Sequence, residues 1–166
     1  MTIGRNTTFV IHLIYMKEAL VILTGIHYSN AVADTAIDWA AKHGVPLRVV
    51  FIEAGREKHE GYGFPSDYSR AEHITNTDDA EKDDQAVVRD YEKLLQDMAR
   101  EKQVSATTSM LTAPSMNEIL SLTKEASLVF VDANYDPNDP LSPHGFTIDK
   151  LKKGSSAPVM VVQEDD

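Results

Sequence analysis

The strongest constraint on the fold is the alternation of short apolar runs with stretches of helical periodicity. Three runs, Ala19–Thr24, Leu47–Ile52 and Leu128–Val131, are rich in aliphatic residues and nearly continuous. Such runs are typical of strands buried on both faces, as in a parallel sheet. The sequence therefore predicts an α/β fold, in which right-handed crossovers place helices on both faces of a mostly parallel sheet.

Local signals mark the ends of the intervening helices. Ser29 is a predicted N-cap, and Gly44 is a predicted C-terminal stop. Ser115 and Glu118 have the spacing of a capping box. The remaining elements follow from periodicity: helices over 30–42, 78–102 and 146–153 (the last ending at Gly154), an edge strand over 104–111, and a final strand over 158–162.

Length and composition exclude several classes of protein. A chain of 166 residues fits one domain, and we expect an extension or arm over 1–17 followed by a single domain over 18–163. The absence of cysteine excludes disulfide frameworks and thiolate metal sites. A net charge of −10 argues against a nucleic-acid partner or an anionic membrane surface, because phosphates would be repelled.

The first residues contain a short apolar run, Phe9–Tyr15, which is far below the length that crosses a membrane. His12 interrupts it and no small-residue cleavage site follows, so it makes a poor signal peptide, and we expect a cytoplasmic protein. Two interpretations stay open. The run is an extra strand or arm that packs on the domain or a partner, or residues 1–15 extend the reading frame upstream of Met16.

A long aperiodic connection over 54–76 separates the second strand from the next helix. Connections of this length are often functional. One interpretation is a lid over the sheet edge, and the other is a variable insertion whose aromatic side chains pack on the surface. The side chains concerned are His59, Tyr62, Phe64, Tyr68 and His73.

Three segments, taken in order, resemble the universal stress protein family. They are the strand–helix unit of 19–50, the helix–strand unit of 117–131, and the ending of 145–162 with its Pro158-Val159-Met160-Val161-Val162. The resemblance implies an open, Rossmann-like, adenine-nucleotide alpha-hydrolase-like fold with a five-stranded parallel sheet of order 3-2-1-4-5. It also implies a stress-response role and a homodimer formed through the last strand.

Nucleotide-binding members of that family carry an aspartate after the first strand and a glycine motif after the fourth, ending in Ser or Thr. Glycines and hydroxyls at these places let backbone N–H groups approach phosphates closely. Here the third glycine is present as Gly145, but the other positions hold Thr24, Asp132, Tyr135 and Phe146. The chain therefore resembles the branch that does not bind ATP, and we expect no nucleotide cofactor.

In an open α/β sheet, ligands bind beyond the carboxyl ends of the strands where the strand order reverses. The predicted site residues of this edge, taken from the family positions, are Thr24, Gly25, Ile52, Asp132, Tyr135, Gly145 and Phe146. A modified pocket here would suit a small-molecule or nucleotide sensor. A third hypothesis is a metal-dependent hydrolase that uses His27, Asp132 and His144. We expect no metal and no enzyme, because no nucleophile accompanies the three residues.

The last strand also carries a prediction about assembly. Val159, Met160, Val161 and Val162 form an apolar strand, which the order 3-2-1-4-5 places at an edge of the sheet. An apolar edge presents unpaired backbone groups and invites pairing with another chain. We expect a twofold dimer in which the two copies of this strand pair, with the Phe9–Tyr15 arm as the other way to cover the edge. The leading interpretation is thus a homodimeric regulatory module that acts through protein partners.

Overall fold

The computed structural model describes residues 17–24, 27–55, 76–139 and 142–164, with the backbone alone over 76–84. Residues 1–16 of the predicted arm, Gly25, Ile26, and residues 56–75 of the long connection with its five aromatic and histidine residues lie outside these ranges. No helix in the described ranges is long and apolar enough to cross a membrane.

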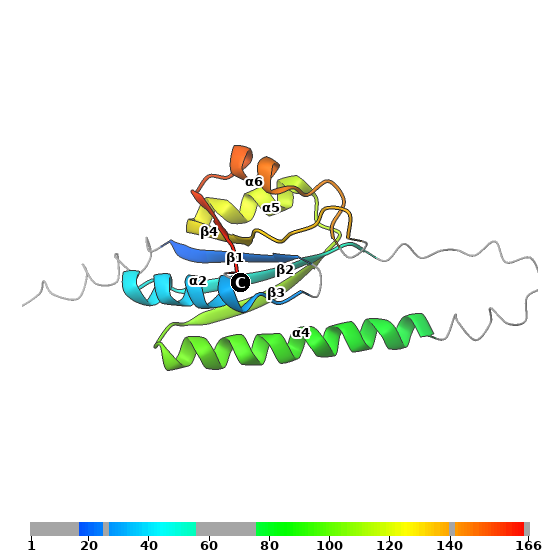
Figure 1. Cartoon of the computed structure of the whole chain (residues 1–166), viewed down its shortest axis with the longest axis horizontal. Coiled ribbons are helices and arrows are strands. Elements are labelled where there is room, and N and C mark those ends of the chain that lie inside the picture. Colours follow the sequence, from blue (N-terminus) through cyan, green and yellow to red (C-terminus); the bar gives the residue numbers. More distant parts are fainter. Residues whose placement is uncertain (1–16, 25–26, 56–75, 140–141, 165–166) are drawn as a thin grey trace, which may run out of the picture.

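A parallel sheet of five strands forms the centre of the molecule, in the order β3-β2-β1-β4-β5 (Figure 1). The predicted order is confirmed, with the weakly alternating strand at one edge and the apolar C-terminal strand at the other. The strands are β1 (Glu18–Thr24), β2 (Leu47–Glu53), β3 (Ala106–Thr112), β4 (Ala126–Asp132) and β5 (Val159–Val162).

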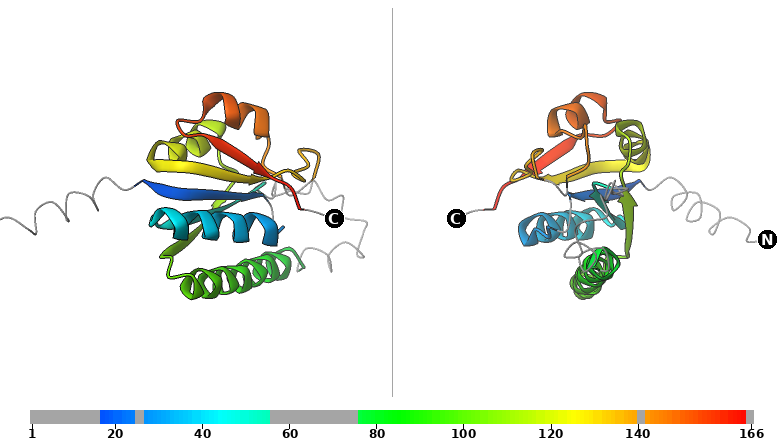
Figure 2. Two further views of the ribbon diagram at one scale, coloured as in Figure 1. Left: turned by 60° about the vertical axis from the view of Figure 1, so that its left-hand side comes forward. Right: turned by 90° about the vertical axis from the view of Figure 1, so that its right-hand side faces the viewer.

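Helices cover both faces of this sheet (Figure 2). Alternate residues of β1 point to opposite sides: Val21 joins the core under the first pair of helices, and Ile22 joins the core under the second. The first pair is α2 (Asn30–His43) and α4 (Asn76–Glu101). The second is α5 (Met116–Leu122), followed by a 3₁₀ turn over Thr123–Glu125, and α6 (Ile148–Gly154).

The predicted caps are confirmed. The Ser29 hydroxyl accepts from the N–H of Val32, and Gly44 ends α2 with a left-handed φ of 64°. Ser115 and Glu118 form the reciprocal capping box of α5. A left-handed residue after a helix favours glycine because it has no Cβ to clash with the backbone.

The prediction for the last helix is wrong at both ends. α6 begins at Ile148 behind the N-cap Thr147, and Phe146 lies before the helix with its ring in the core. Gly154 is the last residue of the helix rather than its stop. A Cβ added there would lie 2.7 Å from Cδ1 of Leu120, so this glycine allows α6 to approach α5 closely.

Candidate functional site

The carboxyl edge of the sheet brings together the β1–α2 loop and the β4–α6 loop (residues 133–147). β1 and β4 are neighbours, and the order of the strands reverses between them. In this fold class the crevice at such a switch point is the usual ligand site. The predicted site residues Thr24, Asp132, Tyr135, Gly145 and Phe146 lie at the end of β1, at the end of β4 and in the β4–α6 loop.

An aromatic pair lies inside the β4–α6 loop. The rings of Tyr135 and Phe146 meet edge to face with centroids 5.1 Å apart, and the Tyr135 hydroxyl donates to the Phe146 carbonyl over 2.9 Å. Phe146 is only 3% exposed and packs with the core below α5 and α6, where Tyr135 joins it. The two side chains therefore fix this loop from within.

Burial of the Tyr135 phenol raises its pKa above the ordinary value of a tyrosine. A hydrogen bond with Ser142 opposes this effect, and the nearby carboxylates of Asp136 and Asp139 add to it. The hydroxyl therefore remains a donor to the Phe146 carbonyl to a higher pH than an ordinary tyrosine would.

Gly145 has a φ of 79°, and nothing lies within 4 Å of a Cβ built on it. Its backbone conformation, rather than lack of space, accounts for glycine here. The Gly145 carbonyl accepts from Nζ of Lys150 over 2.9 Å. Asp132 is also engaged locally, because its carboxylate accepts from the N–H of Asn134 over 2.8 Å.

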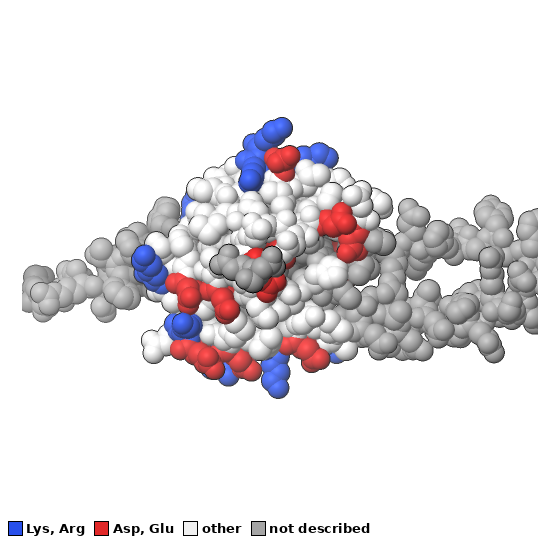
Figure 3. Space-filling view, viewed as in Figure 1, with Lys and Arg blue, Asp and Glu red and all other residues white. Residues whose placement is uncertain are grey.

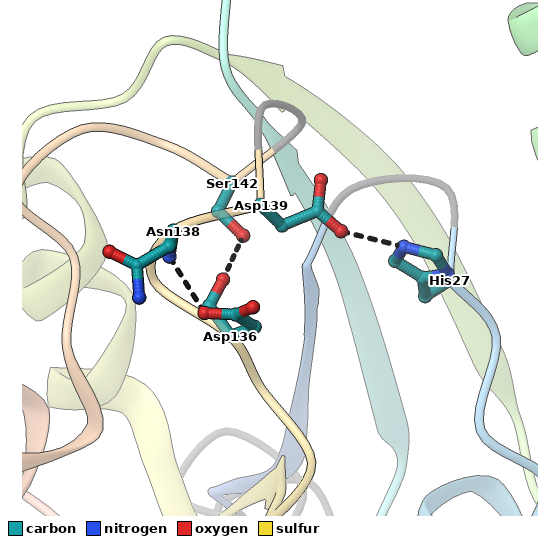
Figure 4. A network of polar contacts seen from close by, with 5 residues as sticks. All are labelled: His27, Asp136, Asn138, Asp139 and Ser142. Carbon is teal, nitrogen blue, oxygen red and sulfur yellow. Dashed lines mark hydrogen bonds and ion pairs between the residues drawn. The ribbon is translucent and has the colours of Figure 1, made fainter.

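A second cluster of polar contacts closes the outer part of the same loop (Figure 4). The Asp136 carboxylate accepts from the N–H of Asn138, and the Ser142 hydroxyl donates to the Asp136 carbonyl, both over 2.8 Å. Asp139 then meets His27 of the β1–α2 loop, with Nε2 of the ring 3.0 Å from Oδ2 of the carboxylate. This pair joins the two loops across the switch point.

The predicted trio of His27, Asp132 and His144 is not assembled. His27 binds Asp139 instead, and His144 lies exposed in the turn before Gly145. Among the described residues, no three His, Asp or Glu side chains gather as ligands of a metal ion. The reason is local, because Asp132 is held by its own turn. No spacing in the sequence pointed to Asp139 as the partner of His27.

Ile52 and Gly25 complete the predicted set. Ile52 is fully buried at the end of β2, within the core under α5 and α6. Gly25 lies outside the described residues.

Two open hollows of about 490 and 420 Å³ lie at the other end of the sheet, around the connection from α4 to β3. They share the segment from Gln103 to Ser105 and do not adjoin the aromatic pair.

Comparison with solved structures identifies the architecture. A universal stress protein from Lactobacillus plantarum matches with a TM-score of 0.59 and 15% identity, over 89% of this chain and 98% of that one. The fold is that of the universal stress proteins. No protein-family model matches the chain, and no curated protein matches its sequence.

Two further structures with this fold were solved with nucleotides. One is the universal stress protein from Archaeoglobus fulgidus in complex with dAMP, with a TM-score of 0.56 and 13% identity over 89% of this chain and 98% of that one. The other is an Arabidopsis thaliana family member with AMP bound, with a TM-score of 0.51 and 12% identity over 90% of this chain and 92% of that one.

Proposed function

We propose that this chain is a universal-stress-protein-like regulatory module that acts through protein partners and does not use ATP. The observation that carries the proposal is the Tyr135–Phe146 pair. Its rings and the hydrogen bond between them occupy the loop in which small residues would let phosphates approach the backbone. Asp132 at the end of β4, with Asp136 and Asp139 in the loop, adds carboxylates beside this pair, and these would repel a triphosphate.

Calorimetric titration of the purified chain with ATP tests this proposal. We expect no binding in the micromolar range and no nucleotide absorbance in the protein as purified. The variant Tyr135→Ala sharpens the test, because it removes one ring and leaves Phe146 in the core. A gain of ATP binding in this variant identifies the tyrosine as the block, and micromolar binding to the unmodified chain overturns the proposal.

The second candidate is a sensor that binds a nucleotide or another small molecule in a modified pocket. It is supported by Gly145, which keeps its left-handed conformation, and by the two nucleotide complexes with the same fold. The same titration with AMP and dAMP separates the two candidates. Saturable binding of a monophosphate without binding of ATP would favour the sensor.

Dimerisation through β5 is part of the proposal. β5 pairs with β4 along one edge, and among the described strands no other pairs with it. Met160 is 39% exposed, whereas Val159 and Val161 are half-buried on the opposite face. A second copy of β5, related by a twofold axis, would supply the missing backbone partners and cover Met160.

Light scattering at tens of micromolar protein tests this assembly. We expect a dimer for the unmodified chain and a monomer for Val161→Lys, because the substitution places a charge at the centre of the pairing. Thr107→Lys is the matched control on the opposite edge strand β3 and should remain a dimer. A monomeric unmodified chain, or dissociation of both variants alike, would contradict pairing through β5.

A further inference from the structure

A strip of apolar side chains runs along α4 beside Tyr28 of the β1–α2 loop. It consists of Val87, Tyr91, Leu94 and Met98 of α4 together with Tyr28 of the β1–α2 loop, and we call it the α2–α4 strip. The Tyr28 and Tyr91 rings stack with centroids 4.9 Å apart, and the Tyr28 hydroxyl donates to Sδ of Met98 over 3.5 Å. These contacts hold the two elements at fixed positions.

The strip is only partly covered by the part of the chain that the structure describes. Leu94 is 45% exposed, and Met160 of β5 is the other large hydrophobic residue exposed to this degree among the described residues. The other α4 residues of the strip are half-buried beside Leu94, namely Val87, Tyr91 and Met98. The four α4 residues follow one another at intervals of four, three and four, which is the spacing of a seam between two packed helices. The side of α4 that packs on the sheet uses a different row, Val88, Leu95 and Ala99.

Acidic side chains border the strip on both sides. Asp34 and Asp38 lie exposed on α2, and Asp90, Asp97 and Glu101 lie exposed on α4. Figure 3 shows Asp and Glu side chains over both helices on this face of the molecule. Cations lie among these carboxylates: Lys102 lies 3.2 Å from Asp38, Arg100 lies 3.5 Å from Asp97, and Lys42, Arg89 and Lys93 are also exposed on the two helices. Exposed pairs of this kind contribute little, so cations of a partner can exchange with them readily.

We propose that the α2–α4 strip is the docking surface for a basic amphipathic helix of a partner protein. The apolar row of that helix would pack on Leu94 and its neighbours, and its Lys and Arg side chains would meet the two acidic borders. The strip of a second copy of this chain fits poorly, because the acidic borders of the two copies would face one another. The biological meaning of this inference rests on the proposed regulatory function. Its test involves neither ATP nor β5, so either proposal can fail without the other.

The probe is a labelled 18-residue peptide of Leu and Lys, with Leu placed at intervals of three and four so that one helical face is apolar. Its binding to the full chain is measured by fluorescence anisotropy. A peptide of the same composition in scrambled order keeps the charge and loses the apolar face. We expect saturable one-to-one binding of the amphipathic peptide and at least about tenfold weaker binding of the scrambled one.

Matched variants assign the binding to the strip. Leu94→Ser should weaken binding about tenfold, whereas Thr107→Ser, at an exposed position of β3, should leave it unchanged. The pair Asp90→Asn with Asp97→Asn should weaken binding severalfold and flatten its dependence on salt. The pair Glu125→Gln with Asp149→Asn removes the same charge from exposed positions near α5 and on α6 and should have little effect.

Three results would overturn the proposal. The scrambled peptide binds as tightly as the amphipathic one, or Leu94→Ser binds like the unmodified chain, or light scattering shows that Leu94→Ser dissociates a dimer of this chain. The last result would assign the strip to a second copy. Leu94 is exposed, so Leu94→Ser should keep the melting temperature of the unmodified chain, and thermal denaturation verifies that the variant is folded.

Discussion

Helices α5 and α6 pack closely on their face of the sheet, whereas α4, on the other face with α2, leaves an apolar side chain exposed. On the first face Phe146 and Leu151 are buried, and Gly154 is so near Leu120 that even a methyl group would collide. On the second face Leu94 is partly open to solvent, and Tyr28 and Tyr91 stack at the margin of the core. The proposed block to ATP lies on the closed side, and the proposed docking surface lies on the open side.

The lengths of the helices account for this difference. α5 and α6 have seven residues each, and isolated helices of fewer than about 12 to 15 residues are marginal in water. They exist only because they pack tightly on the sheet and on each other. α4 has 26 residues and is about 39 Å long, whereas the seven residues of β3 span only about 23 Å. A long helix can leave apolar side chains exposed, because one row of contacts suffices to hold it.

The largest effect expected on the closed face comes from Phe146→Ala. Removing a buried aromatic ring should lower the free energy of unfolding by about 3–5 kcal/mol, as judged by chemical denaturation. Tyr135→Phe removes only the hydrogen bond to the Phe146 carbonyl and should cost about 1 kcal/mol. Equal losses for the two variants would mean that Phe146 contributes to folding through the loop alone and not through the core.

A leucine from each face gives the most direct comparison. Leu151→Ala, on α6, should lower the free energy of unfolding by about 2–5 kcal/mol, because its side chain is fully buried. Leu94→Ala, on α4, should change it by less than about 0.5 kcal/mol, as is usual at exposed positions. Urea denaturation of both variants provides the measurement. A large loss for Leu94→Ala would show that α4 is held through the strip, and it would contradict the open face described here.

The N-caps of α5 and α2 give a second comparison of the two faces, with smaller expected changes in the free energy of unfolding. Ser115 accepts from the N–H of Glu118 over 3.2 Å and donates its own N–H to the Glu118 carboxylate over 2.7 Å, whereas Ser29 makes one longer bond of 3.4 Å. Ser115→Ala should cost about 1 kcal/mol and Ser29→Ala less. Thermal melting of the two variants ranks them. The reverse order would indicate that α2 depends on its cap more than the short α5 does.

A last effect, confined to alkaline pH, concerns Tyr28 on the open face. Burial, with the Asp34 carboxylate second, raises the pKa of Tyr28 from 10.0 to about 12. A group with a higher pKa in the folded state adds stability that is present below the unfolded pKa and is lost as pH rises through the folded one. Stability should therefore decline between about pH 10 and 12. Tyr28→Phe should decline less over this range, and parallel curves for the two proteins would contradict the raised pKa.

Local signals in the sequence were sufficient for the elements and their order. Continuous apolar runs identified the buried strands, because a strand in the middle of a parallel sheet meets helices on both faces. The weak alternation before Leu111 identified β3 as an edge, and its residues are indeed only half-buried or exposed. The caps Ser29, Gly44 and Ser115 were predictable because a cap is decided by residues within one turn of the helix.

Contacts between distant residues decided the rest. The pattern around Phe146 looks helical, yet its ring enters the core and the helix begins two residues later. Gly154 looks like a stop, but its function depends on Leu120, 34 positions earlier in the chain. His27 meets Asp139 and not Asp132, because the turn at the end of β4 holds Asp132 on its own backbone. The α2–α4 strip likewise depends on the packing of Tyr28 against Tyr91, 63 positions later in the chain. The sequence by itself determined which residues are apolar and which helix caps are strong. Only the tertiary structure decided which apolar side chains are buried and which stay exposed, because burial depends on which elements meet in space and not on their order along the chain.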